Sequence, residues 1–413
     1  MLIAGLLAQT AGAQKTASFR VRNPLNSECT DELVVLKRKD IEKKLGAVPE
    51  GKFLTVTAAG KPVVVQLDDV TGDRRWDEAL FLHSFGPKEA AVFKLAVADK
   101  GAEGAVRAHV RLKKKAADDS WGPAIAREEM PLRRPATDFS KNPLPDYLTE
   151  GPAWENDKVA FRLYLDVRNN KDIYGKTTAR MVLDSVGTKA QPSYHELHDW
   201  GMDILHVVKS LGAGALALQV PRGDGTDTLI RLGGQNVKRT VYEALADGPV
   251  RARFRMTYDW EVGGKPVQVA EEIRIWGGQY FYESKVTVKG APAGTKLVTG
   301  IADFYDNVFQ CFPAGSSQVV FSHGRQSENK DFLGMAILMP RRGFAFAGSA
   351  PAAGSEVLTS WLAAQDIREG APCTYRYYAG WERTDQRFAR LPGFRDFLRE
   401  QAVREGQPVT IHW

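Results

Sequence analysis

The stretch "PAWENDKVAFRLYLD", residues 152–166, has the alternation of a β-strand. Counting in twos places apolar side chains on one face: Val159, Phe161, Leu163 and Leu165. The opposite face carries an amide, two cations, a phenol and a carboxylate: Asn156, Lys158, Arg162, Tyr164 and Asp166. The first face predicts a core, and the second has the composition of a polar ligand site. The alternative is a solvated strand face with a few cross-strand pairs.

Similar alternating segments, separated by Gly and Pro turns, recur along the whole chain. Those within residues 17–115 predict a small N-terminal β-sandwich, with a short helical pattern near 38–46. Residues 116–150 contain several prolines and no sustained period, which indicates a linker. Residues 151–413 predict a large antiparallel sandwich ending in an amphipathic helix near 390–406. We therefore expect an all-β protein with two domains, because 413 residues are too many for one ordinary core.

The first thirteen residues, "MLIAGLLAQTAGA", form a short apolar run that ends in small residues. This pattern predicts a signal peptide over 1–13, shortened because its basic start is missing, and hence a periplasmic or secreted protein. A frayed apolar terminus is the alternative. No later run of 18 or more apolar residues occurs, so we expect no membrane insertion.

The net charge of +6 favours acidic partners weakly, because the 56 basic and 50 acidic residues are interspersed. Basic clusters without interleaved aromatic residues argue against nucleic acid. We expect a monomer or a weak homo-oligomer.

Cysteines and acidic clusters indicate no cofactor. Cys311 and Cys373 could pair, but buried free thiols are an equally good interpretation of these residues and of Cys29. Five acidic residues crowd "QLDDVTGDRRWDE", residues 66–78. A polar hairpin tip is the favoured interpretation, and a structural calcium loop is the alternative.

The densest cluster of reactive side chains lies in "SYHELHDWGMDILH", residues 193–206. It holds Tyr194, His195, His198, Asp199, Trp200, Asp203 and His206. The histidine spacings of three and eight lack the helical pair of a zinc motif, so we predict no metal. Residues 168–180, predicted as a loop, add Asp172, Tyr174, Lys176 and Arg180.

A second polar face is formed by three arginines on one predicted strand, Arg251, Arg253 and Arg255. Pairing with Glu271 and Glu283 on neighbouring strands is the favoured explanation. The motifs of serine hydrolases, P-loop enzymes and nicotinamide enzymes are absent from the sequence.

At "WENDKVAFRLY", "DIYGK", "SYHELHDWGMDIL" and "SLGAGALAL" the chain resembles the bacterial family named domain of unknown function 4861. It departs from that pattern at Val208, where the family has a glycine. The resemblance implies an exported protein of polysaccharide-degrading bacteria. It also implies a small N-terminal β-domain and a large sandwich similar to the galactose-mutarotase-like supersandwich. Members are suspected to act as lyases or dehydratases on uronate oligosaccharides.

Elimination from a uronate requires a cation for the carboxylate, a base for the neighbouring C–H and an acid for the leaving oxygen. We assign Arg162 and Lys176 to the carboxylate, His195 to the base, and Tyr174 or Tyr194 to the acid. Trp154 and Trp200 are the expected sugar platforms. The remaining predicted lining is Asn156, Lys158, Tyr164 and Asp203. The alternatives are a glycoside hydrolase using Glu155 with Asp203 or Asp303, and a non-catalytic carbohydrate-binding protein.

Overall fold

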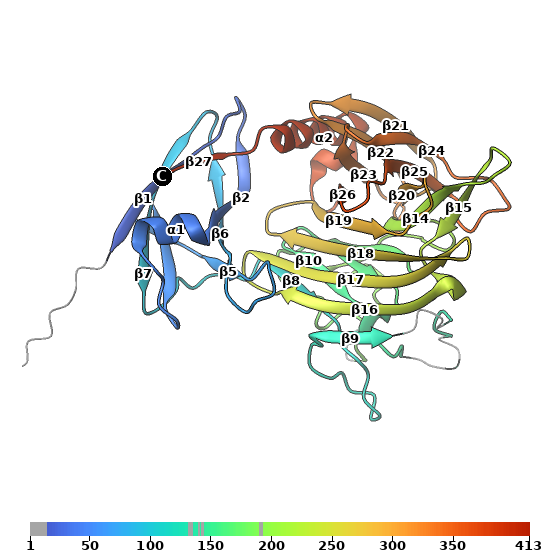
Figure 1. The fold of residues 1–413 in the computed structure, drawn as a ribbon, viewed down its shortest axis with the longest axis horizontal. Coiled ribbons are helices and arrows are strands. Elements are labelled where there is room, and N and C mark those ends of the chain that lie inside the picture. The colour runs from blue at the N-terminus through green and yellow to red at the C-terminus, as the bar shows by residue number, and fades with distance from the viewer. Residues whose placement is uncertain (1–14, 131–134, 139–140, 142–143, 190–192) are drawn as a thin grey trace, which may run out of the picture. The chain divides into compact units, whose positions relative to one another are not determined.

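The computed structural model describes residues 15–130, 135–138, 141, 144–189 and 193–413 (Figure 1). The described chain is built of antiparallel strands, which confirms the predicted all-β class. The two predicted helices are present as α1 (Arg38–Leu45) and α2 (Leu391–Gly406). The predicted signal peptide lies outside the described residues. The chain divides into unit 1, residues 1–104 with 409–413, and unit 2, residues 105–408.

Unit 1 packs two sheets around a core that includes Phe19, Val21 and Phe93. One sheet has the order β27-β1-β7-β3-β4 and the other β2-β6-β5. The strands are β1 (Thr16–Arg22), β2 (Cys29–Lys37), β3 (Phe53–Ala58), β4 (Lys61–Val63), β5 (Gln66–Asp68), β6 (Glu78–Phe85), β7 (Ala90–Ala98) and β27 (Thr410–His412). The acidic stretch 66–78 forms the β5–β6 hairpin, as favoured. In its turn, Asp69 and Asp77 accept hydrogen bonds from backbone amides.

The described residues of unit 2 form antiparallel sheets, one of which has nine strands. The long sheet has the order β21-β22-β23-β26-β19-β18-β17-β16-β9, and its neighbours β16 to β19 run side by side in Figure 1. Its strands are β9 (Arg127–Met130), β16 (Val237–Ala246), β17 (Arg251–Val262), β18 (Lys265–Trp276), β19 (Phe281–Lys289), β21 (Asn307–Ala314), β22 (Ser317–Gly324), β23 (Leu333–Pro340) and β26 (Cys373–Trp381).

The sheet that positions the site has the order β13-β12-β11-β10-β8. It comprises β8 (Ala108–Arg111), β10 (Ala153–Asn156), β11 (Val159–Leu163), β12 (Lys171–Lys176) and β13 (Gly201–Asp203). A further sheet, β15-β14-β20-β25-β24, comprises β14 (Ala213–Pro221), β15 (Asp227–Arg231), β20 (Lys296–Ala302), β24 (Phe344–Ser349) and β25 (Ser360–Asp366). Short 3-10 turns lie at η1 (Leu148–Glu150), η2 (Gly234–Asn236) and η3 (Gln386–Ala389).

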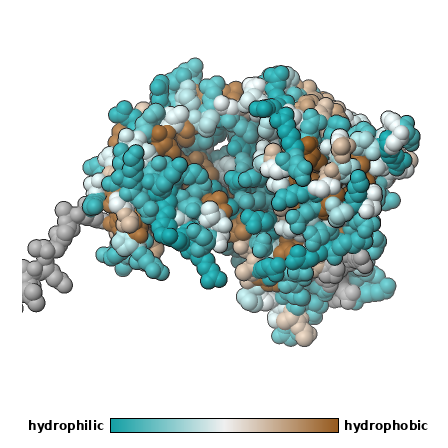
Figure 2. All heavy atoms as spheres, in the orientation of Figure 1, coloured by the Kyte–Doolittle hydropathy of each residue, from teal (hydrophilic) through white to brown (hydrophobic). Residues whose placement is uncertain are grey.

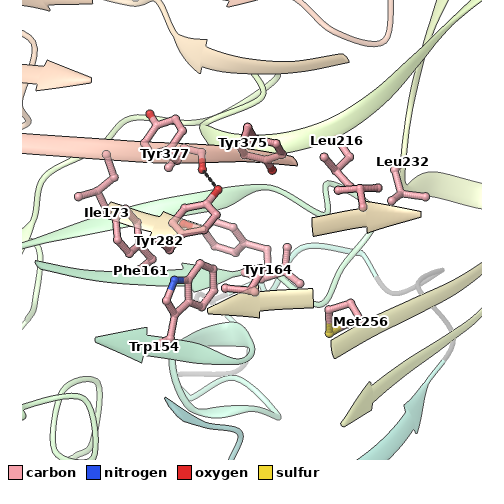
Figure 3. Packing of buried hydrophobic residues seen from close by; sticks show 14 of the residues in the cluster. Trp154, Phe161, Tyr164, Ile173, Leu216, Leu232, Met256, Tyr282, Tyr375 and Tyr377 are labelled. Atoms are coloured by element: carbon pink, nitrogen blue, oxygen red, sulfur yellow. Dashed lines mark hydrogen bonds between the residues drawn. The ribbon is translucent and has the colours of Figure 1, made fainter. Parts of the chain in front are cut away.

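The core of unit 2 lies between facing strands and is rich in aromatic rings. Phe161 of β11 and Tyr282 of β19 meet edge to face, with ring centroids 4.9 Å apart (Figure 3). On β17 the alternation buries Phe254 and Tyr258, as predicted. Two of its arginines pair within the sheet with a glutamate that the sequence did not indicate: Arg253 lies 2.9 Å and Arg255 3.9 Å from Glu272. Glu271 instead pairs with the buried Lys171.

Three strands belong to a different part of the fold from the one that the sequence predicted for them. Strand β8, expected in the N-terminal sandwich, pairs with β10 of unit 2. Strand β9, expected to be linker, pairs with β16. Strand β27, expected in the large sandwich, pairs with β1 of unit 1. Short segments of four residues or fewer give little periodic signal, so their sheet partners decide where they belong.

Cys29, Cys311 and Cys373 are free thiols, and only Cys311 among these is exposed. Among the described residues, no helix has the length and hydropathy needed to cross a membrane. Hydrophilic side chains cover most of the surface seen in Figure 2, with small apolar areas between them.

Candidate functional site

The polar face of β11 is buried, which corrects the prediction that it lines an open floor. Arg162 is only 1% exposed. The segment between β12 and β13 covers this face, because Leu183 and Trp200 pack against Ala160 and Tyr174 of the sheet. Alternation identifies which side chains share a face, but it does not show what covers them.

Two charged residues of the sheet hold this covering segment in place. One carboxylate oxygen of Glu155 accepts hydrogen bonds from the amides of Val182 and Leu183, both 2.7 Å. Its other oxygen accepts a hydrogen bond from Lys176, whose ammonium is also buried. Arg111 donates to the Leu183 carbonyl, with its Nε at 3.1 Å. Lys176 therefore cannot clamp a substrate and Glu155 cannot act as a hydrolytic acid, because their polar atoms are buried and paired.

Three other predicted lining residues are structural. Trp154 is fully buried among core rings and lies opposite Phe161 on the neighbouring strand (Figure 3). Asn156 donates to two carbonyls and accepts from two amides, so its hydrogen-bonding capacity is used. The ammonium of Lys158 lies 5.8 Å from the ring centroid of Tyr280. None of these three joins the histidine cluster among the contacts of the described residues.

Arg162 is the centre of a buried polar cluster. Its Nη2 donates to Asp172 and to Asp203, each at 2.7 Å. Its Nη1 donates to the Tyr194 hydroxyl at 3.1 Å. The guanidinium carbon lies 4.3 Å from the ring centroid of Tyr164. A guanidinium so fully engaged positions its neighbours and is not free to bind a substrate carboxylate, which corrects the predicted clamp.

Burial controls the protonation of this cluster. It raises the pKa of Asp203 well above its ordinary value, and the charge of Asp172 adds to the effect while Arg162 opposes it. Burial also raises the pKa of Tyr174, whose hydroxyl has no hydrogen-bond partner among the described residues. Tyr174 is fully buried, beside the rings of Tyr194 and Trp200. A proton donor must reach its substrate, so Tyr174 does not suit the predicted acid role.

His195 connects this cluster with solvent. Its side chain is 63% exposed, and its Nδ1 lies 3.6 Å from Oδ2 of Asp203. Desolvation of the imidazole lowers the pKa of His195, and the positive charge of Arg162 lowers it further. The ring is therefore mainly neutral at pH 7, and a proton on Nδ1 facing Asp203 leaves Nε2 able to accept one. Of the larger set predicted to share one cleft, the structure brings His195, Tyr194, Tyr164 and Asp203 together.

Glu328 is a nearby functional candidate that the sequence did not indicate. Its amide donates to the carbonyl of Ile204, directly after Asp203. Its carboxylate accepts a hydrogen bond from the Tyr305 hydroxyl at 2.6 Å and lies 3.7 Å from Nδ1 of His206. Its charge acts on both His195 and Asp203. More than a hundred residues separate Glu328 from the histidine motif, so no local pattern could have linked them.

Lys330 adds a cation beside Glu328. Its Nζ lies 4.2 Å from the ring centroid of Tyr305. Lys330 is exposed and forms no ion pair within the described part of the chain. It therefore presents a free positive charge at this surface.

An aromatic pair continues this surface through Asn307. Trp361 stacks on Phe309 with ring centroids 4.3 Å apart, and both rings are partly exposed. The Trp361 indole donates to Asn307, whose amide donates to the Tyr305 carbonyl at 2.7 Å. Trp200, the predicted platform, is only 7% exposed. Trp361 is therefore better placed than Trp200 to contact a sugar ring.

The sequence model of the family described as "Domain of unknown function (DUF4861)" matches residues 21–411. The match confirms the family that the quoted motifs resemble. The "Uncharacterized protein P7" of Formosa agariphila is 24% identical over 288 residues, which cover 65% of this chain and 63% of that protein.

Two solved structures are similar in fold. An alpha-mannosidase from Enterococcus faecalis V583 superposes with a TM-score of 0.51 at 12% identity, over 96% of this chain and 46% of that one. A protein in glycosyl hydrolase family 38 from Enterococcus faecalis gives a TM-score of 0.52 at 12% identity, over 96% and 47%. This chain therefore spans less than half of either protein, and at this identity the likeness concerns the fold alone.

Proposed function

This chain belongs to the family of domain of unknown function 4861, a name that assigns no activity, and we propose that it is a carbohydrate-active enzyme that cleaves uronate-containing oligosaccharides by β-elimination. The observation that carries the proposal is the exposed imidazole of His195 beside the buried carboxyl group of Asp203. Asp203 is in turn fixed by Arg162. An exposed imidazole beside a buried carboxyl group is suited to proton abstraction.

In the proposed reaction, Nε2 of His195 removes the proton from the carbon next to the uronate carboxylate. The C–H electron pair forms the new double bond, and the bond to the leaving oxygen breaks. Tyr194, which is partly exposed and accepts a hydrogen bond from Arg162, donates its proton to that oxygen. Lys330 neutralises the carboxylate as charge develops on it. The Trp361 face provides apolar contact for a sugar ring.

Hydrolysis is the second candidate, and one observation favours it. Burial raises the pKa of Asp203 well above its ordinary value and the charge of Glu328 acts on it, although Asp203 is only 3% exposed and so meets the same objection as Tyr174. A protonated and an ionised carboxyl group are the pair that glycoside hydrolysis uses. Two proteins of similar fold are named as a mannosidase and a glycosyl hydrolase family 38 member. Export to the periplasm or outside the cell remains a prediction for either activity.

Incubation with a panel of uronate oligosaccharides distinguishes these reactions. Elimination creates a conjugated unsaturated uronate that absorbs in the ultraviolet, with no addition of water to the summed product mass. Hydrolysis adds one water and creates no new absorbance. A protein that only binds sugars gives neither product but shows heat of binding by calorimetry.

His195→Ala tests the assignment of the base. Loss of a general base should lower kcat by roughly 10²- to 10⁴-fold with little change in substrate affinity. The wild-type rate should rise with pH through a pKa below 6.5, and this limb should vanish in the variant. His83→Ala, a partly exposed histidine of unit 1, is the matched control. Full turnover by His195→Ala on a confirmed substrate would exclude this role.

Lys330→Gln tests the carboxylate contact. Because it removes the free cation at the site, KM for a uronate oligosaccharide should rise about tenfold, while binding of a neutral analogue should stay the same. Lys289→Gln, an exposed lysine on β19, controls for the change in net charge. If the variant lost affinity equally for acidic and neutral sugars, Lys330 would have a structural role instead.

A further inference from the structure

One face of the β27-β1-β7-β3-β4 sheet in unit 1 presents cations without acidic partners. Along β1 the alternation exposes Ser18, Arg20 and Arg22 while it buries Phe19 and Val21. The two arginine side chains therefore project from the same face, roughly 7 Å apart along the strand.

Pairing with the neighbouring strands extends this basic face. Arg20 lies opposite His412 of β27 on one side and opposite Val92 of β7 on the other. Ser18 lies opposite Lys94 of β7, another exposed cation. Directly paired residues of antiparallel strands point to the same face. The exposed side of this sheet thus carries positive charge on two central strands and an imidazole at the edge.

Carboxylates do not balance these charges. Within the described residues, Arg20, Arg22 and Lys94 form no ion pair. The arginines of β17 in unit 2 show the contrast, because there Arg253 and Arg255 both lie near Glu272. Like charges at neighbouring positions of a sheet repel one another and destabilise it when no carboxylate lies between them. An anionic ligand bound to this face would relieve that repulsion.

The same face is hollowed into an open groove of about 760 Å³. Its lining includes Arg20, Arg22, Lys88, Val92, His412 and Trp413. Val92 is 53% exposed, and the partly buried Trp413 packs on Phe19 with ring centroids 5.1 Å apart. The groove therefore combines several charge-assisted donors with apolar walls.

We propose that this groove binds an extended anionic polysaccharide, and that unit 1 thereby holds the enzyme on its polymeric substrate. The ligand class rests on the proposed function of unit 2, but binding in the groove needs no catalysis. A uronate polymer presents carboxylates along its length to the arginines and aliphatic ring faces to Val92. The groove lacks the row of stacking aromatic side chains that single-stranded nucleic acids require. Tethering raises the local concentration of cleavable bonds at the site.

The test measures the affinity for polygalacturonate by calorimetry, for the wild-type full chain and for its double variant Arg20→Gln/Arg22→Gln. Neutral dextran is the uncharged probe. The double variant should bind polygalacturonate about tenfold or more weakly, since hydrogen bonds from charged groups contribute strongly. Arg74→Gln/Arg75→Gln, two exposed arginines of the β5–β6 turn, is the matched control and should bind as the wild type does. The exposure of all four arginines makes loss of folding unexpected, and circular dichroism checks it.

Unchanged polygalacturonate affinity in Arg20→Gln/Arg22→Gln would overturn the proposal. So would wild-type binding to oligo-dT or to anionic vesicles that exceeds binding to polygalacturonate. The two proposals fail separately. His195→Ala should keep full polymer binding, and the double variant should keep full turnover of short oligosaccharides. Absence of turnover in the wild type would reject the proposed function and leave the binding result intact.

Discussion

Arg162 joins three carboxylates, those of Glu150, Asp172 and Asp203, and three tyrosine rings in a buried cluster. Arg162→Met should lower the free energy of unfolding by about 3–5 kcal/mol, because it leaves Asp172 and Asp203 buried without their cation. Arg162→Lys should recover only part of this loss, since an ammonium lacks the planar fork. Urea unfolding measures both variants.

The matched control for this prediction is Arg180→Met. Arg180 pairs with Asp199, and both side chains are more than two-thirds exposed. A surface pair of this kind contributes at most about 1 kcal/mol. If Arg162→Met proved as mild as Arg180→Met, the cluster would not be the rigid support that the site requires.

The sequence could predict which residues gather at the site, but not which of them meet solvent. Arg162, Tyr194, His195 and Asp203 were assigned to one place, because their motifs combine titratable groups. Trp154 and Lys176 were assigned to the same open cleft, yet one lies in the core and the other beneath the covering segment. A buried polar face and an exposed one have the same alternation, and only the tertiary contacts distinguish them.

We expect the attachment of the segment between β12 and β13 to depend on pH. His109 of β8 lies with Nδ1 3.0 Å from Asp247 and Nε2 3.4 Å from Asp184 of this segment. Burial opposes the imidazolium, but the two carboxylates together raise the pKa of His109 to about 9. The stabilisation is therefore complete below pH 6.5 and is lost as the pH rises through about 9.

His109→Gln should flatten the fall in unfolding free energy between pH 6.5 and pH 9. Urea unfolding at several pH values across this window measures the slope. His412→Gln serves as a control for the loss of one histidine at an exposed position. An identical slope in His109→Gln would show that other groups produce the pH dependence.

Elements with clear periodicity were predictable, and elements without it were not. Helix α2 follows its predicted range closely, and the strand predicted from Arg251, Arg253 and Arg255 is present as β17, because each alternates or repeats over more than ten residues. Residues 171–176 were predicted as a loop, since Gly175 and flanking polar residues suggest a turn. They form β12 with both faces buried, where Gly175 is needed because a Cβ would lie 2.3 Å from the Trp381 ring.

At the scale of the whole molecule, each unit has its own core and its own buried thiol. Cys29 is buried in unit 1 and Cys373 in unit 2. Trp413→Ala removes the ring that packs on Phe19, so it should destabilise unit 1 by about 1–3 kcal/mol. Thiol labelling should then become faster at Cys29 and stay unchanged at Cys373.

Cys311 is exposed, so it should react first in every variant and calibrates the reagent. Equal acceleration at Cys29 and Cys373 would mean that the two units unfold as one, which would contradict separate cores. Val308→Ala, an exposed apolar residue of β21, provides a control substitution and should change neither rate.

The pairing of β27 with β1 has a consequence for how the protein is made. A ribosome releases β1 early, but its partner β27 emerges only after all of unit 2 has been synthesised. Until then one edge of β1 has unpaired backbone groups, and such edges recruit other strands. The first sheet of the nascent chain therefore lacks its edge strand β27 until translation ends. We expect chaperones to bind the chain during this interval.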